Sequence, residues 1–165
     1  MAVSTLITDT LIQNSIVNAV QNVSRTMMNR DTVLRGRTVA PPPKATFEII
    51  GNVGFAGEAN GIVYLCLTTD YANYATGEML GMSPGEVEMN GWEVVKDAIG
   101  EITNMTVGGF KNALCDVGFP CKLSLPTIVR GTALHVSAIK SATRHYFEFD
   151  CGGHTLFADI QLRTD

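Results

Sequence analysis

The sequence lacks a long apolar run. No stretch approaches the roughly 18 uninterrupted apolar residues that a membrane-spanning helix needs, and the amino terminus lacks the basic start and apolar core of a signal peptide. We therefore expect no membrane partner and a cytoplasmic location. With 165 residues and 45% hydrophobic content, the chain is long enough to bury a core of its own, and we expect a single domain over residues 1–165.

Concentrated basic charge is also absent. Lysine and arginine together number 12 against 16 aspartates and glutamates, and the basic residues are scattered along the chain. A surface that binds nucleic acid needs a concentrated basic patch for its phosphate contacts. The sequence therefore argues against a nucleic-acid partner and is compatible with a protein partner.

The cysteines form no Cys-x-x-Cys pair, and they lie within or beside apolar segments at Cys66, Cys115, Cys121 and Cys151. Such positions are typical of free structural thiols. Cys151 and His154 have the spacing of a metal-ligand pair, but Gly152-Gly153 between them favours a hairpin turn, and no second pair is evident in the sequence. We expect no metal site and no cofactor held by this chain.

Helical periodicity marks three segments. Apolar residues recur at helical spacing over 4–28, with Ser4 or Thr5 as the expected cap, over 70–80, and over about 90–114. Between the last two, the stretch GMSPGEVEMN breaks the pattern. After the first, the charged stretch RDTVLRGRTV and the prolines at 41–43 predict a loop, because proline neither continues a helix nor enters the middle of a sheet.

Strand-like runs occupy much of the remaining chain. Runs over 44–55 and 61–68 flank a glycine-rich turn and predict a hairpin. Four more runs follow the third helix: KLSLPTIV, TALHVSAIK, RHYFEFD and TLFADIQLR. The last alternates so that Leu156, Ala158, Ile160 and Leu162 should lie on one buried face. The order of elements predicts an α+β fold with long helices on one face of a largely antiparallel sheet, and it hints at a weak internal repeat.

The helix over 90–114 has two unlike faces. At about 100° per residue its apolar face consists of Val95, Ile99, Ile102, Thr106 and Gly109, flanked by Ala98 and Met105. Roughly opposite, at about 180–240° from Val95, lie Asp97, Glu101, Asn104 and Gly108. We expect the first face to be buried and the second to point outward.

A solvated polar stripe is the ordinary interpretation of such an outward face, but three details favour a functional one. No lysine or arginine follows the carboxylates at i+4, so the stripe is not assembled from ion pairs. Asn104 is a poor residue for a helix interior, because its carboxamide competes for backbone hydrogen bonds. Gly108 and Gly109 each cost roughly 1 kcal/mol relative to alanine, and they leave room for another surface to come close.

Glu101 and Asn104 offer two different chemical tools. The carboxylate pairs with a cation or acts as an acid or base, whereas the carboxamide both donates and accepts and so can hold a water in a fixed orientation. No histidine lies near enough in the sequence to indicate a catalytic triad. The pair suits water-directed hydrolysis on a partner that brings its own electrophile and metal.

The arrangement Asp97-x-x-x-Glu101-x-x-Asn104, followed by Pro126 in KLSLPTIV, closely resembles the signature of the CheC/CheX/FliY family of chemotaxis phosphatases. The similarity extends to GFAGEANGIVYLCLTTDYANYATGEMLG and to RHYFEFDCGGHTLFADIQL, and so covers nearly the whole chain. With a single complete signature, the chain is most similar to the CheX branch. The first helix holds Asn14, Asn18 and Gln21 at the same spacing but has no carboxylate at the middle position, as a relic of duplication would.

The resemblance implies a phosphatase that hydrolyses the aspartyl phosphate of a CheY-like response regulator. By that resemblance Asn104 orients the attacking water and Glu101 pairs with the lysine of the regulator's active site. Asp97 and Gly108 are the candidate partner-binding residues, and Pro126 is expected to be structural. Mg²⁺ is expected in the phosphorylated receiver domain and not in this chain. The resemblance also implies a homodimer formed by sheet edges.

Two other interpretations remain open. The same fold and docking face would serve a non-catalytic chemotaxis or flagellar-switch scaffold that binds a response regulator, because a fold does not fix a function. A small-molecule hydrolase could use Asp97 and Glu101 as a carboxylate pair, but no sequence feature supplies a pocket for it.

Overall fold

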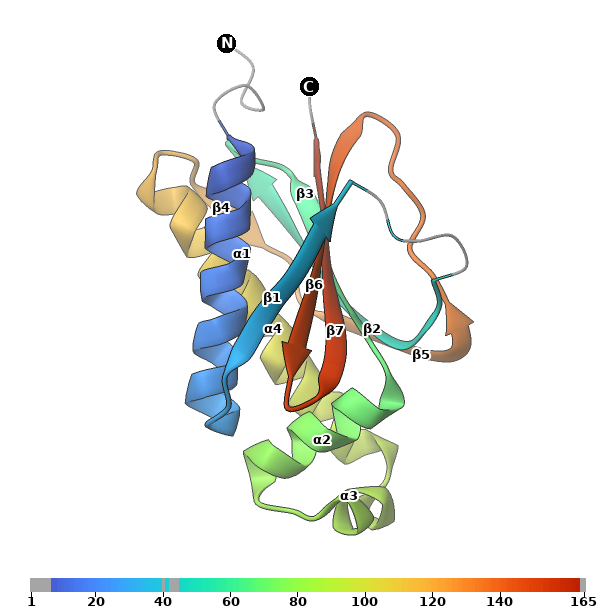
Figure 1. Cartoon of the computed structure of the whole chain (residues 1–165). Coiled ribbons are helices and arrows are strands. Elements are labelled where there is room, and N and C mark those ends of the chain that lie inside the picture. The colour runs from blue at the N-terminus through green and yellow to red at the C-terminus, as the bar shows by residue number, and fades with distance from the viewer. Residues whose placement is uncertain (1–6, 40, 42–44, 164–165) are drawn as a thin grey trace.

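The computed structural model describes residues 7–39, 41 and 45–163. Within them, one antiparallel sheet of seven strands carries α1 and α4 on one face, and α2 and α3 lie at one end (Figure 1). The helices are α1 (Asp9–Val23), which continues into a π-helical turn over Ser24–Met28, α2 (Thr69–Leu80), α3 (Pro84–Asn90) and α4 (Trp92–Asp116). The strands are β1 (Thr32–Thr38), β2 (Phe47–Gly57), β3 (Gly61–Leu67), β4 (Cys121–Leu123), β5 (Thr127–Leu134), β6 (Ala142–Cys151) and β7 (His154–Arg163).

The sheet has the order β1-β6-β7-β3-β2, and both β4 and β5 pair with β2. The two predicted hairpins are present as β2–β3 and β6–β7. Gly152 and Gly153 make the turn of the second with φ angles of 60° and 84°, which glycine adopts without a steric cost. The predicted α+β class, with helices on one face of an antiparallel sheet, is confirmed.

The apolar face of α4 forms the centre of the core. Ile99, Val107 and Phe110 are almost fully buried, and the Phe110 ring lies 5.8 Å from that of Phe55 on β2. α4 approaches the sheet closely because Gly51 has no side chain: a Cβ there would overlap the side chain of Thr103. These two contacts fix α4 along the length of β2.

The first predicted helix begins later than expected. α1 starts at Asp9, and the Thr8 side chain caps it by accepting a hydrogen bond from the Leu11 amide. The predicted caps Ser4 and Thr5 lie outside the described residues.

Two predictions for the regions between these elements were wrong. The segment expected to be a loop after the first helix contains β1, an outer strand that pairs with β6. The stretch GMSPGEVEMN contains α3, which has a capping box between Ser83 and Glu86 and a proline in its first turn. Both α3 signals are local in the sequence, whereas β1 depends on a distant partner strand.

The first two of the four runs after the third helix were also predicted too simply. KLSLPTIV divides at Ser124–Pro126 into β4 and β5, and TALHVSAIK leaves the sheet after Leu134. Residues beyond Leu134 then lie over the far face of the sheet, where Gln161 of β7 donates to the carbonyl of Ser137 and accepts from the amide of Ile139. A buried polar side chain therefore holds a segment that the sequence pattern assigns to a strand.

The predicted alternation of β7 is confirmed on the helix side, where Leu156, Ala158, Ile160 and Leu162 are buried. The opposite side is partly buried as well, at Asp159 and Gln161. Asp159 is 0% exposed and receives a bidentate pair from Arg144, whose Nη2 lies 2.6 Å from Asp159 Oδ2 and also donates to the carbonyl of Val136. This ion pair satisfies the charges that the far face would otherwise bury unpaired.

Candidate functional site

The outward face of α4 forms a polar ridge, defined here as Asp97, Glu101, Asn104 and Gly108. The three side chains are exposed and Gly108 is half-buried, whereas Val95, Ile99 and Ile102 on the opposite face are buried. The predicted division of this helix into two faces is therefore confirmed at these side chains, but Gly109, predicted on the buried face, is exposed and Gly108, predicted on the outward face, is half-buried. Met105, expected at the edge of the buried face, is 39% exposed.

The polar groups of the ridge are not used inside the protein. Within the described part of the chain, the side chains of Asp97, Glu101 and Asn104 take part in no hydrogen bond and no ion pair. Side chains that stabilise a helix surface usually have a partner three or four residues away. A carboxylate and a carboxamide one turn apart are thus left free to meet groups of another molecule.

The two adjacent glycines of α4 have different roles. A Cβ added at Gly109 would lie 3.2 Å from the Cβ of Ala19, so Gly109 allows α1 to pack closely against α4. A Cβ added at Gly108 would meet nothing within 4 Å. The fold therefore accounts for Gly109 but not for Gly108, although both weaken the helix.

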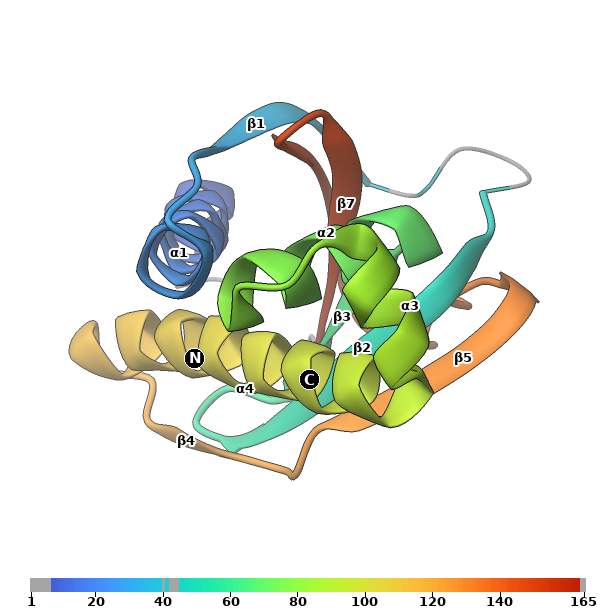
Figure 2. The same cartoon turned by 90° about the horizontal axis from the view of Figure 1, so that it is seen from below.

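The polar ridge lies between two neighbouring elements. Seen from below, α4 has α1 on one side and the β4–β5 connection on the other (Figure 2). On the α1 side a groove borders Asn104, and it is lined also by Asn22 and Thr26. On the other side lies the connection that carries Pro126, which is half-buried and separates β4 from β5. The sequence pattern along α4 did not predict these flanks, because they come from other elements.

The partial second signature on α1 is in part structural. Asn14 and Asn18 are exposed, but Gln21 is half-buried and donates from Nε2 to the carbonyl of Thr32, at the start of β1. Gln21 therefore helps to hold the outer strand against the end of α1.

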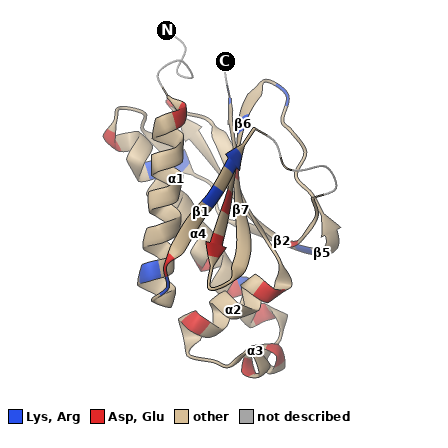
Figure 3. Cartoon of the chain, viewed as in Figure 1, with Lys and Arg blue, Asp and Glu red and all other residues tan. Residues whose placement is uncertain are grey.

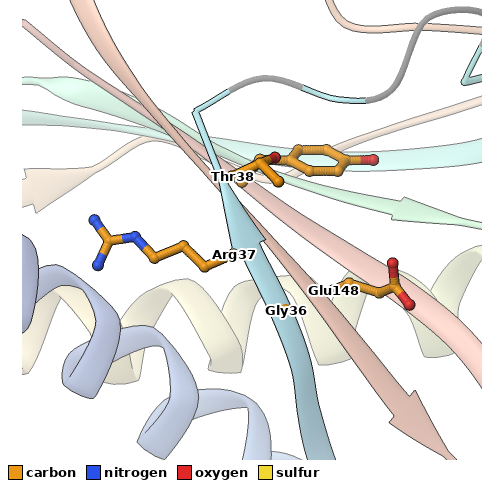
Figure 4. Close-up of a pocket in the computed structure, with 5 residues that line it drawn as sticks. Gly36, Arg37, Thr38 and Glu148 are labelled. Atoms are coloured by element: carbon orange, nitrogen blue, oxygen red, sulfur yellow. The ribbon is translucent and has the colours of Figure 1, made fainter.

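The hollows, cysteines and acidic residues elsewhere in the described structure do not form a comparable site. A small hollow is lined by Gly36, Arg37, Thr38, Tyr146 and Glu148 of β1 and β6, none of which belongs to the polar ridge (Figure 4). The cysteines are free, as predicted. Among the residues that the structure describes, no three histidine, cysteine or acidic side chains are grouped to hold a metal ion.

The distribution of charge and the hydropathy of the helices do not change the choice of the polar ridge as the candidate site. In the view of Figure 3, lysine and arginine are spread over several elements and do not gather into one patch. No helix in the described ranges is both long enough and apolar enough to cross a membrane. The polar ridge is thus the surface whose chemistry the fold itself leaves unexplained.

Comparisons with known proteins agree with the family resemblance found in the sequence. The family model described as "Chemotaxis phosphatase CheX" matches residues 49–150. No curated protein matches the sequence significantly. The crystal structure of chemotaxis protein CheX from Vibrio vulnificus is similar, with a TM-score of 0.82 and 25% identity over 92% of this chain and 99% of that one.

Two further crystal structures share the fold. A CheC-like superfamily protein from Shewanella sp. PV-4 has a TM-score of 0.83 with 23% identity, over 94% of this chain and 99% of that one. CheX in the CheX-CheY-BeF3-Mg complex from Borrelia burgdorferi has a TM-score of 0.74 with 18% identity, over 92% of this chain and 97% of the other. Since the family model spans more than half of the sequence, the chain belongs to the CheX family of chemotaxis phosphatases.

Proposed function

We propose that this chain hydrolyses the aspartyl phosphate of a CheY-like response regulator. The observation that carries the proposal is the polar ridge, where Glu101 and Asn104 are exposed one turn apart without partners in the described residues. The related CheX from Borrelia burgdorferi forms a complex with CheY, BeF3 and Mg²⁺, which supports a receiver domain as the partner. A regulator of this kind is cytoplasmic, so we place the chain in the cytoplasm.

The proposed mechanism divides the chemistry between the two proteins. The receiver domain contributes the phosphorylated aspartate, the lysine and Mg²⁺, so this chain needs no metal. Asn104 enters the receiver's active site, where its carboxamide holds a water in line with the phosphorus atom. Glu101 pairs with the lysine and fixes the orientation of the two proteins, and Asp97 strengthens the docking. Such positioning lowers the barrier to phosphoryl transfer mainly by ordering the reactants and requires no strong base.

An exposed helix face fits this substrate better than a pocket does. The acyl phosphate of a receiver domain lies on another folded protein, so the catalytic groups must extend outward to reach it. Asp97 and Glu101 lie on an exposed helix face and not in an enclosed cavity, which disfavours a small-molecule hydrolase.

The test is phosphate release from a Mg²⁺-loaded, phosphorylated CheY-like receiver with substoichiometric amounts of this protein. Asn104→Ala should lower the stimulated rate by about 100-fold or more, because positioned catalytic groups typically contribute that much. Asn14→Ala, which removes an exposed helical asparagine from α1, is the matched control and should retain full activity. Full activity of Asn104→Ala would remove this residue from the mechanism.

The same assay separates the enzyme from a scaffold. A non-catalytic scaffold would bind the phosphorylated receiver with 1:1 stoichiometry and leave its phosphate intact. Clearance of many equivalents of phosphorylated receiver by one equivalent of this protein would reject the scaffold.

We also propose a homodimer that forms through sheet edges. β1 is an outer strand with one side free of strand pairing in the described structure, and unpaired strand edges favour association. A monomeric mass at micromolar concentration in analytical ultracentrifugation would contradict it.

A further inference from the structure

The β4–β5 connection presents an exposed leucine beside the polar ridge. Leu125 is 88% exposed, and with Met89 it is one of the two most exposed large apolar side chains of the described residues. A single exposed leucine is common on protein surfaces and needs no explanation by itself. What distinguishes Leu125 is how it is held and what lies next to it.

The backbone of Leu125 is restrained from both sides, by hydrogen bonds of Ser124 and by Pro126. The Ser124 amide donates to the carbonyl of Gly54 at 2.9 Å, and the Ser124 hydroxyl accepts from the Gly54 amide at 2.9 Å and donates to the carbonyl of Leu125 at 3.2 Å. Pro126 restricts the backbone of the residue before it to extended conformations. The backbone of Leu125 is therefore restrained with its side chain exposed before any partner arrives, which lowers the entropy cost of binding.

Contacts along β2 show which part of α4 lies level with Leu125. Gly51 packs against Thr103 near the middle of α4, and Phe55 packs against Phe110 further along it. Gly54, the partner of Ser124, lies between these two points. Leu125 is thus level with the turns of α4 that follow Thr103 and end before Phe110, where Asn104 and Gly108 face outward.

A second contact places the start of β5 beside an earlier turn of α4. A Cβ at Gly100, next to Glu101 in α4, would lie 3.9 Å from Cγ1 of Ile128, near the start of β5. The connection therefore passes alongside α4, the helix that carries the polar ridge, on the side opposite α1 (Figure 2).

We propose that Leu125 is an apolar anchor for the receiver domain on which Glu101 and Asn104 act, an inference that rests on the proposed function. A receiver that admits Asn104 into its active site must cover the flanks of α4, and Leu125 lies on one of them. Exposed polar pairs contribute little affinity, whereas a few buried apolar side chains dominate most interfaces. Met105, 39% exposed on the α1 side of the ridge, supplies a smaller apolar contact there.

The proposal also gives Pro126 a role. The resemblance to the phosphatase family identifies a proline at this position but not its purpose. By restricting Leu125, Pro126 acts as a positioning residue for the anchor and does not touch the reacting atoms.

The test compares Leu125→Ala with Met89→Ala, because Met89 is 89% exposed but lies on α3, away from the ridge. Three quantities are measured: kcat and KM for phosphate release from a phosphorylated CheY-like receiver, and the Kd for the same receiver loaded with Mg²⁺ and BeF3. Leu125→Ala should raise both KM and Kd by roughly tenfold with kcat unchanged, the loss expected for one buried leucine side chain. Met89→Ala should change none of the three, and Pro126→Ala should raise KM by a smaller factor.

Other outcomes would overturn the proposal. An unchanged Kd and KM for Leu125→Ala would remove Leu125 from the interface, and a lower kcat with unchanged KM would exclude a docking role. If Leu125→Ser changes the mass of the free protein in solution and leaves KM unchanged, a second copy of this chain covers the leucine instead. If the wild type binds the BeF3-loaded receiver through Leu125 but releases no phosphate, the anchor is supported and the proposed hydrolysis fails.

Discussion

The adjacent glycines of α4 allow the same substitution to be tested in two environments. We expect Gly108→Leu to raise the free energy of unfolding by about 0.5–1 kcal/mol, because leucine is a far better helix former than glycine and a Cβ at this position meets nothing within 4 Å. Gly109→Leu gains the same helix preference, but its Cβ would lie 3.2 Å from that of Ala19. Forcing α1 away from α4 costs about 1–3 kcal/mol, the range typical of overpacking.

The two variants should therefore differ by about 1–3 kcal/mol in unfolding free energy. Urea unfolding followed by circular dichroism measures this difference, and for a chain of this size each kcal/mol corresponds to about 2–4 °C in Tm. Equal stabilities would show that α1 does not pack tightly at Gly109. A loss of stability in Gly108→Leu would refute the inference that Gly108 has no role in the fold.

The same pair tests the approach of the partner. Gly108→Leu should retain its fold and still lose phosphatase activity, with kcat/KM falling at least about tenfold, because a leucine on the polar ridge holds the receiver away from Asn104. A stable and fully active Gly108→Leu variant would show that the receiver does not come close at this residue.

Two further predictions concern titratable groups away from the ridge. Burial lowers the pKa of His145, so the unfolded chain binds a proton more readily than the folded one. The contribution of neutral His145 to the free energy of unfolding should therefore be fully present above about pH 6.5 and fall as the pH drops below it. In urea unfolding at several pH values, the free energy of unfolding should fall less at acid pH for His145→Gln than for the wild type. The same fall in both proteins would contradict the prediction. Among the cysteines, half-buried Cys115 should react first with a thiol reagent at neutral pH, whereas buried Cys66, Cys121 and Cys151, whose pKa burial raises, should wait for unfolding. A Cys115→Ala variant that still reacts rapidly when folded would refute this order.

The sequence predicted those parts of the fold that depend on local periodicity. α4 and β7 were identified because buried residues recur about every 3.6 residues in a helix and every 2 in a strand. The same periodicity placed Glu101 and Asn104 opposite the buried face, and their exposure is confirmed. α3 was missed even though Ser83 and Glu86 form a capping box that is visible in the sequence.

The remaining elements depend on partners far along the chain. β1 is polar and interrupted by Gly36, and it becomes a strand because β6 supplies its hydrogen bonds. The segment after Leu134 has a strand-like pattern but is held instead by hydrogen bonds to the Gln161 side chain of β7. Tertiary hydrogen bonds decided both cases, and local propensity cannot anticipate them.

The sequence by itself therefore determined the chemistry of the polar ridge, because the spacing of Glu101 and Asn104 within one helix fixes their common face. Only the tertiary structure decided what surrounds that ridge. The separate roles of Gly108 and Gly109 depend on where α1 packs, and the position of Leu125 depends on the pairing of Ser124 with a strand about seventy residues earlier. The residues that share one face of a helix are set by their spacing in the chain. The elements that lie beside that helix are set by contacts that form only when distant segments fold together.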